Sequence, residues 1–253
     1  MSGHSKWSTI KRKKGALDAK RGKLFARHIR AIESAARTGG ADPEANPTLA
    51  TAIQNAKDDS MPKDNIERAL RRAAGKEGGG VEYEHASFEG YAAGGVALLI
   101  ECLTDNRNRA SNDVKGAFNK HGGNLAEPGA VSYLFNRTGQ VLVPTEGVEE
   151  DDILMAGLEA GEAGITEVLA EGDQYTVLCD PKDTVPVRRA LEDAGVPVNS
   201  SDVTMRPTVT VPITEESDAK RVLKLVDTLE DLDDVQSVYA NFDIPDRVLE
   251  TVV

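Results

Sequence analysis

Positively charged side chains gather near the start of the chain, and their spacing favours contact with phosphate groups. Residues 6–30 hold ten Lys and Arg against a single acid, Asp18. A helix over residues 16–37, at about 100° per residue, would place five cations within one sector of roughly 100°. These cations are Lys20, Lys23, Arg27, Arg30 and Arg37. Like charges at such spacings repel one another in an isolated helix. The stripe therefore indicates an anionic partner, with a merely solvated basic face as the alternative.

A second basic group precedes this helix. It contains Lys6, Trp7, Lys11, Arg12, Lys13 and Lys14. Residues 1–14 show no sustained periodicity, so we expect an arm that is disordered when free and gains order on a polyanion. An aromatic ring among cations is suited to stacking on a base, although Trp7 could equally be a hydrophobic anchor.

A third candidate lies further along the chain, in a polar turn between a strand and a helix. It consists of Asn106, Arg107, Asn108 and Arg109. Arg and Asn beside a helix N-terminus can bind phosphate or base edges. The equal alternative is an Asn-capped turn with solvated arginines.

Other chemistry finds little support in the sequence. His4, His28, His85 and His121 fall in an arm, a helix and two expected loops, without metal-ligand spacing. The glycine-rich segments match neither a P-loop nor a dinucleotide fingerprint. The acid runs 149–152 and 230–234 are expected to be surface charge at helix ends. We expect no catalytic residues, no metal and no cofactor, and hence no enzyme.

Charge and composition agree with a nucleic-acid partner. Residues 1–75 hold 16 Lys and Arg against 8 Asp and Glu, whereas residues 76–253 hold 14 against 34, within a net charge of −12. Such asymmetry favours a polyanionic partner for one end only. No apolar run approaches the roughly 18 residues of a membrane span, and no signal peptide precedes the basic segment, so we expect a cytoplasmic protein. Cys102 and Cys179, both in expected strands, are interpreted as small buried residues.

The periodicity predicts three helices, followed by alternating strands and helices. The second helix should start at Asn46-Pro47 and the third near Met61-Pro62, before a glycine linker at 76–80. Beyond it we expect strands at 96–103, 130–135, 140–143, 166–170, 175–179, near 203, 208–213 and 235–241. Helices are expected at 111–120, 149–159, 185–194 and from about 219 to 229. The expected helices are too few to cover both faces of one parallel sheet. The order of elements therefore favours two α+β sandwiches, and we expect an α+β multidomain fold.

Several short motifs, in one order, resemble those of the YebC/PmpR family. They are Gly3-His4-Ser5-Lys6-Trp7, Arg21-Gly22-Lys23, Gly39-Gly40-Ala41-Asp42-Pro43, Asn46-Pro47, Met61-Pro62-Lys63-Asp64-Asn65-Ile66 and Thr104-Asp105-Asn106-Arg107-Asn108-Arg109. The resemblance implies a three-helix N-terminal domain over residues 1–80. It also implies an α+β domain from 81–135 plus 207–253, with a further α+β domain, 136–206, inserted in it.

The resemblance also implies function. Members of this family are described as DNA-binding transcriptional regulators. Relatives that include the mitochondrial translational activator of cytochrome oxidase act on translating ribosomes. We therefore expect a monomeric nucleic-acid-binding protein, either on promoter DNA or on rRNA or tRNA of the ribosome, with no membrane partner.

Overall fold

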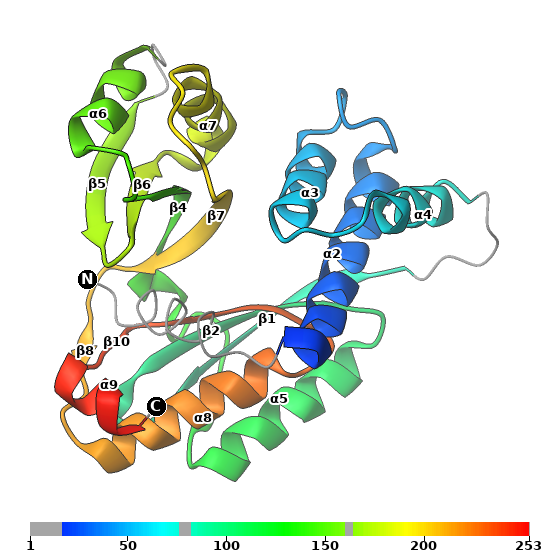
Figure 1. Cartoon of the computed structure of the whole chain (residues 1–253). Coiled ribbons are helices and arrows are strands. Elements are labelled where there is room, and N and C mark those ends of the chain that lie inside the picture. The colour runs from blue at the N-terminus through cyan, green and yellow to red at the C-terminus, as the bar shows by residue number, and fades with distance from the viewer. Residues whose placement is uncertain (1–16, 76–81, 160–163, 253) are drawn as a thin grey trace. The chain divides into compact units, whose positions relative to one another are not determined.

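The computed structural model describes residues 17–75, 82–159 and 164–252, and only the backbone of residues 17–20, 159 and 246. The chain divides into two compact units (Figure 1). One contains the described parts of residues 1–57, 61–135 and 207–253; the other contains residues 58–60 and the described parts of 136–206. The finer division into three domains stays a prediction.

The chain starts with the three predicted helices, which are confirmed: α2 (Leu17–Gly39), α3 (Pro47–Asp58) and α4 (Lys63–Ala73). Their apolar faces meet in a small core that includes Ile32, Leu49 and Ile66. The buried Asn46 joins α2 to α3. Its Oδ1 accepts the Leu49 N–H at 3.1 Å, and its Nδ2 donates to the carbonyl oxygens of Ala35 and Gly40, each at 2.8 Å. One side chain thus caps α3 and ties it to the end of α2.

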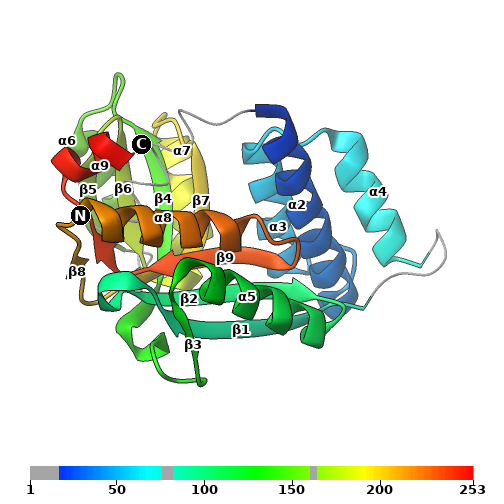
Figure 2. The same ribbon diagram turned by 90° about the horizontal axis from the view of Figure 1, so that it is seen from below.

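The main sheet of the first unit is antiparallel and has the order β3-β1-β2-β9. Its strands are β1 (Glu84–Tyr91), β2 (Ala97–Thr104), β3 (Asn124–Ala126) and β9 (Val235–Ala240). Helices α5 (Arg107–His121) and α8 (Glu216–Glu230) lie side by side on one face of this sheet (Figures 1 and 2). The predicted sandwich of a sheet with helices on one face is confirmed.

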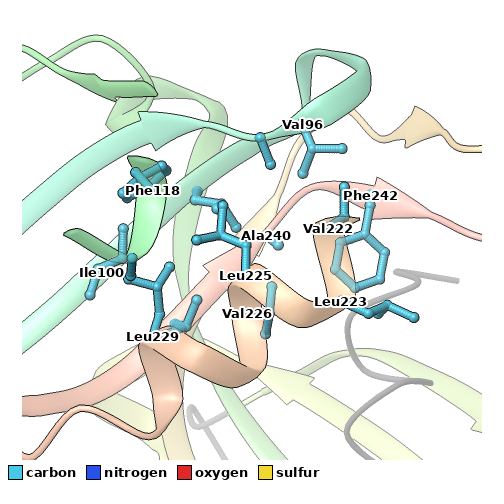
Figure 3. Packing of buried hydrophobic residues seen from close by; sticks show 14 of the residues in the cluster. Val96, Ile100, Phe118, Val222, Leu223, Leu225, Val226, Leu229, Ala240 and Phe242 are labelled. Atoms are coloured by element: carbon cyan, nitrogen blue, oxygen red, sulfur yellow. The ribbon is translucent and has the colours of Figure 1, made fainter. Parts of the chain in front are cut away.

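The core between this sheet and its helices holds both layers together. Ile100 of β2, Phe118 of α5 and Leu225 and Leu229 of α8 are each at most 1 % exposed and face the same interior (Figure 3). At Gly90 of β1, an added Cβ would stand 2.6 Å from the Phe118 ring, so only glycine permits this close approach of α5.

Short elements complete the first unit. Single 3₁₀ turns cover Ala93–Gly95 and Ser132–Leu134. Strands β8 (Val211–Pro212) and β10 (Phe242–Asp243) pair in parallel, and α9 (Asp246–Val252) follows them.

The second unit is a smaller sandwich with the sheet order β5-β6-β4-β7. Its strands are β4 (Phe135–Pro144), β5 (Ile165–Glu171), β6 (Gln174–Cys179) and β7 (Ser200–Pro207), and its helices are α6 (Glu150–Glu159), α7 (Thr184–Asp193) and the 3₁₀ turn Pro181–Asp183. Strands β5 and β6, which were expected at 166–170 and 175–179, pair in an antiparallel direction. Both α helices pack on the sheet face formed by Val141, Val143, Val177 and Cys179.

Several predicted boundaries are wrong. Residues 130–134, where a strand was expected, form a loop with a 3₁₀ turn. Strand β4 begins at Phe135 and includes the strand expected at 140–143. Strands β1, β3 and β10 and helix α9 were not predicted. Among the described residues, no helix combines the length and apolarity needed to cross a membrane.

Candidate nucleic-acid interface

The stripe on α2 lies against the segment that follows α8. We call residues Glu230–Asp234 the acidic turn. Lys23 donates to the carbonyl oxygen of Asp231 at 3.0 Å, and its Nζ lies 3.3 Å from the Asp231 carboxylate. Arg27 donates to the carbonyl oxygen of Glu230, and Arg30 to that of Asp233. Three cations of the stripe therefore already contact oxygen acceptors of the chain itself.

These contacts differ in burial. The Lys23 and Asp231 side chains are 47 % and 63 % exposed, which places their ion pair in solvent. Arg27 is half-buried, and burial lowers its pKa, while the neighbouring Glu230 and Asp231 carboxylates oppose that shift. Exposed pairs contribute only about 0–1 kcal/mol each, so another anion can compete for Lys23.

The N-terminus of α5 reaches the same acidic turn. Arg109 donates from Nε to Asp234 Oδ2 at 3.0 Å and from Nη2 to both Asp234 carboxylate oxygens at 2.8 Å. It also donates to Asp105 at 2.6 Å. These hydrogen bonds, chiefly those to Asp234 and then the one to Asp105, raise the pKa of Arg109. The pair locks the start of α5 to the start of β9.

Two separately predicted groups thus converge. The hydrogen bond from Arg109 is the main cause that lowers the pKa of Asp105, and the charge of Arg30 on α2 contributes to the same shift. The stripe and the 106–109 segment therefore meet around one acidic turn, although about 80 residues separate them in sequence.

The segment 106–109, predicted as a polar turn, is helical from Arg107 onwards. Asn106 is the N-cap of α5, since its Oδ1 accepts the Arg109 N–H at 3.1 Å, and Arg107 begins the helix. Arg107 and Asn108 are exposed in the first turn, where the helix dipole favours anions. Arg109 is part-exposed, but Asp234 and Asp105 already accept its hydrogen bonds in this arrangement.

The structure does not describe all of the predicted contact residues. Lys6, Trp7, Lys11, Arg12, Lys13 and Lys14 are outside the described residues, as is the side chain of Lys20. On α4, Arg68, Arg71 and Arg72 are exposed, and Arg72 lies 3.5 Å from the buried Glu33 carboxylate.

The histidine positions also need correction. His85 lies in β1 and His121 in the last turn of α5, not in loops. His121 Nε2 is 2.8 Å from Thr228 Oγ1, and burial followed by the charges of Lys120 and Lys224 lowers its pKa. Within residues 17–75, 82–159 and 164–252, no group of three His, Cys, Asp or Glu side chains is arranged to hold a metal ion.

The sequence interpretation missed two buried carboxylates. The run 230–234 was expected to be surface charge, but Asp234 is only 5 % exposed. Glu89 on β1 accepts the backbone N–H groups of Gly129, Val131 and Ser132 at 2.6–2.9 Å and fixes the loop before β4. No spacing within the sequence links either residue to its partners.

The segment that contains α2 and the segment that contains α5 and the acidic turn both match models of known protein families. Residues 5–76 match the model of the TACO1/YebC protein N-terminal domain, and residues 83–242 match that of the TACO1/YebC second and third domain. The chain belongs to the TACO1/YebC family. The predicted resemblance to this family is therefore confirmed.

Individual TACO1/YebC relatives match along their full length. A protein of Thermobifida fusca and one of Streptomyces avermitilis, both named "Probable transcriptional regulatory protein", are each 55 % identical over 252 residues. The match covers 100 % of this chain in both cases, and 100 % and 99 % of those proteins. The crystal structure of a conserved hypothetical protein from Aquifex aeolicus shares the fold with a TM-score of 0.81 and 45 % identity, covering 90 % of this chain and 93 % of that one.

Proposed function

We propose that this chain is a non-enzymatic, cytoplasmic DNA-binding transcriptional regulator that acts as a monomer. The names of its full-length relatives support regulation of transcription. The basic stripe on α2 supports nucleic acid as the ligand, with Lys20, Lys23, Arg27 and Arg30 as phosphate contacts. The proposal adds the arm residues Lys6, Trp7 and Lys11–Lys14.

The convergence of three stripe cations on the acidic turn is the observation that carries the proposal. Lys23, Arg27 and Arg30 contact oxygen acceptors spaced along one short segment. Phosphate oxygens along a nucleic-acid backbone offer the same kind of acceptor with a full negative charge at each step. Binding would then exchange internal acceptors for phosphates, and Arg107 and Asn108 lie beside the same turn to add contacts.

The negative charge of the rest of the protein restricts nucleic-acid binding to this basic surface. Residues 76–253 carry a net charge of −20, so nucleic acid is repelled from most of the molecule. Contacts confined to phosphates would position the protein without reading the base sequence.

The test measures binding of full-length protein to a labelled promoter duplex at several salt concentrations. Replacing Lys20, Lys23, Arg27 and Arg30 together by Gln should weaken binding. It should also make the decrease of log K with log salt concentration less steep, by the equivalent of up to about four phosphate contacts. Circular dichroism checks that the fold persists.

A matched control removes the same charge elsewhere. Lys115, Lys120, Lys220 and Lys224 are exposed on α5 and α8, and their joint replacement by Gln changes net charge equally. If both quadruple variants lose affinity alike, the stripe has no special role and the proposal fails.

The alternative function, a translation factor on rRNA or tRNA, uses the same cations. Competition between promoter duplex and purified ribosomes at one salt concentration separates the two. If the protein prefers ribosomes, and if this preference is lost after RNase treatment, the ligand is RNA and not DNA.

A further inference from the structure

Helix α6 of the second unit is apolar on two opposite sides. Ile153 and Ala156 are buried in the core against β4 and β6. On the other side, Leu154, Met155 and Leu158 are 43 %, 65 % and 78 % exposed. At about 100° per residue, these three side chains span roughly 100°, and the centre of their sector lies about 180° from the centre of the buried one. We call them the outer stripe of α6 (Figure 1 shows the helix).

This outer stripe is unusual for the protein. Of seven large hydrophobic side chains exposed among the described residues, three belong to this one helix of ten residues. Scattered exposed apolar residues are ordinary, whereas a contiguous group points to an interaction surface. Because the opposite side of α6 fills the core, folding of the unit does not need the outer stripe.

The charge around the outer stripe points to the kind of partner. Residues 138–181 contain eleven Asp and Glu and no Lys, Arg or His. Glu150 and Asp151 are exposed in the first turn of α6, and Asp151 lies three and four residues before Leu154 and Met155, on the same side. Carboxylates therefore flank the apolar stripe at its N-terminal end.

We propose that the outer stripe of α6 is a docking surface for a cationic amphipathic helix of another protein. The apolar side of that helix would cover Leu154, Met155 and Leu158, and its Lys or Arg side chains would pair with Glu150 and Asp151. The flexible Met155 can adapt to different apolar side chains.

Other occupants fit the same features less well. A second copy placed α6 against α6 would bring together two units in which residues 136–206 hold fifteen acids and five bases, and like charges would oppose this contact. Nucleic acid would be repelled for the same reason. The inference does not depend on the proposed DNA binding, because it uses different residues in a different unit.

The test uses full-length protein and a labelled synthetic helix of Leu and Lys in an amphipathic order. We expect saturable binding by fluorescence anisotropy, with amide shifts in NMR spectra confined to α6 and its neighbours. The joint change Leu154→Ser, Met155→Ser and Leu158→Ser should weaken binding at least about tenfold, since it removes the apolar side chains at the centre of the proposed contact. The thermal midpoint should stay nearly unchanged.

Two controls separate the outer stripe from general attraction. A scrambled Leu/Lys peptide with the same charge but no apolar face should bind much more weakly. The change Tyr133→Ser with Val209→Ser removes exposed apolar groups in the first unit, at 71 % and 60 % exposure, and should leave binding unaltered.

Equal binding of the scrambled peptide, or of the triple serine variant, would overturn the proposal in favour of nonspecific charge attraction. Sedimentation that shows a wild-type dimer dissolved by the same triple change would assign the surface to a second copy instead.

Discussion

The carboxylate of Asp234 accepts hydrogen bonds from both Nε and Nη2 of Arg109, at 3.0 and 2.8 Å, across 125 residues of sequence. The Asp234 side chain is 7 % exposed, whereas that of Arg109 is 46 % exposed. The two partners therefore depend on each other unequally, because a buried charge without a partner costs far more than a hydrated one.

This asymmetry predicts different costs for the two single changes. Arg109→Gln leaves the buried Asp234 carboxylate without its cation and should lower the free energy of unfolding by about 3 kcal/mol. Asp234→Asn leaves Arg109 paired with Asp105 and partly hydrated, so a loss of about 1–2 kcal/mol is expected. Urea unfolding measures both.

The neighbouring Arg107→Gln serves as the control, because Arg107 is exposed in the same helical turn and should change stability by less than about 0.5 kcal/mol. Equal costs for Arg109→Gln and Asp234→Asn would show that burial of the carboxylate does not govern this pair.

The helices could be predicted because their causes are local. Apolar residues recur at helical spacing in α2, α3 and α4, and Asn46-Pro47 marks a start that the Asn46 cap confirms. Strand β1 could not be predicted from its own residues. It contains Glu84, His85, Ser87, Glu89 and Gly90, and it is a strand because β2 and β3 pair with its two edges.

The candidate site divides in the same way. The alignment of Lys23, Arg27 and Arg30 follows from helical spacing and is readable in the sequence. Their acceptors lie more than 200 residues away, at Glu230, Asp231 and Asp233, and only the tertiary structure brings them together.

The two cysteines should be unreactive in the folded protein. Cys102 in β2 is 1 % exposed, and its burial, followed by the charges of Asp234 and Glu101, raises its pKa to about 12. Burial raises the pKa of Cys179 as well. Because the thiolate is the reactive form, labelling by a disulfide reagent at pH 8 should be at least about 100-fold slower than in urea. Single Cys102→Ala and Cys179→Ala variants assign each rate, and rapid native labelling of Cys102 would contradict this account.

Glu89 should make stability depend on acid pH. Burial alone would raise its pKa, but the N–H groups of Gly129, Val131 and Ser132 outweigh burial and lower it. A lowered pKa means that the carboxylate stabilises the fold at pH values above the unfolded pKa of about 4.3. This contribution is lost as the pH falls through the folded pKa.

The change Glu89→Gln should therefore cost about 1.5–3 kcal/mol at pH 7, because an amide replaces a charged acceptor of three donors. The difference from wild type should shrink at pH values below the folded pKa of Glu89. Glu84→Gln, at an exposed position of the same strand, is the control. A difference that stays constant with pH would mean that lost packing, and not the carboxylate charge, causes the effect.

Neutralising the acidic turn should strengthen nucleic-acid binding if its residues compete with phosphate for the stripe. The joint change Glu230→Gln, Asp231→Asn and Asp233→Asn leaves Asp234 in place and should raise duplex affinity about 2–10-fold at low salt. The gain is limited because Arg27 and Arg30 contact backbone carbonyl oxygens, which the change retains.

Net charge alone would also raise affinity, so the decisive measurement is a double-mutant cycle. Neutralising the exposed Glu84, Glu127 and Glu250 of the same unit changes net charge equally without touching the turn. In a background with Lys23, Arg27 and Arg30 replaced by Gln, the effect of the turn change should fall to that of this control, because the cations for which the turn competes with phosphate are gone. An undiminished gain in that background would show that the turn acts only through long-range charge, and that its contacts with α2 do not regulate binding.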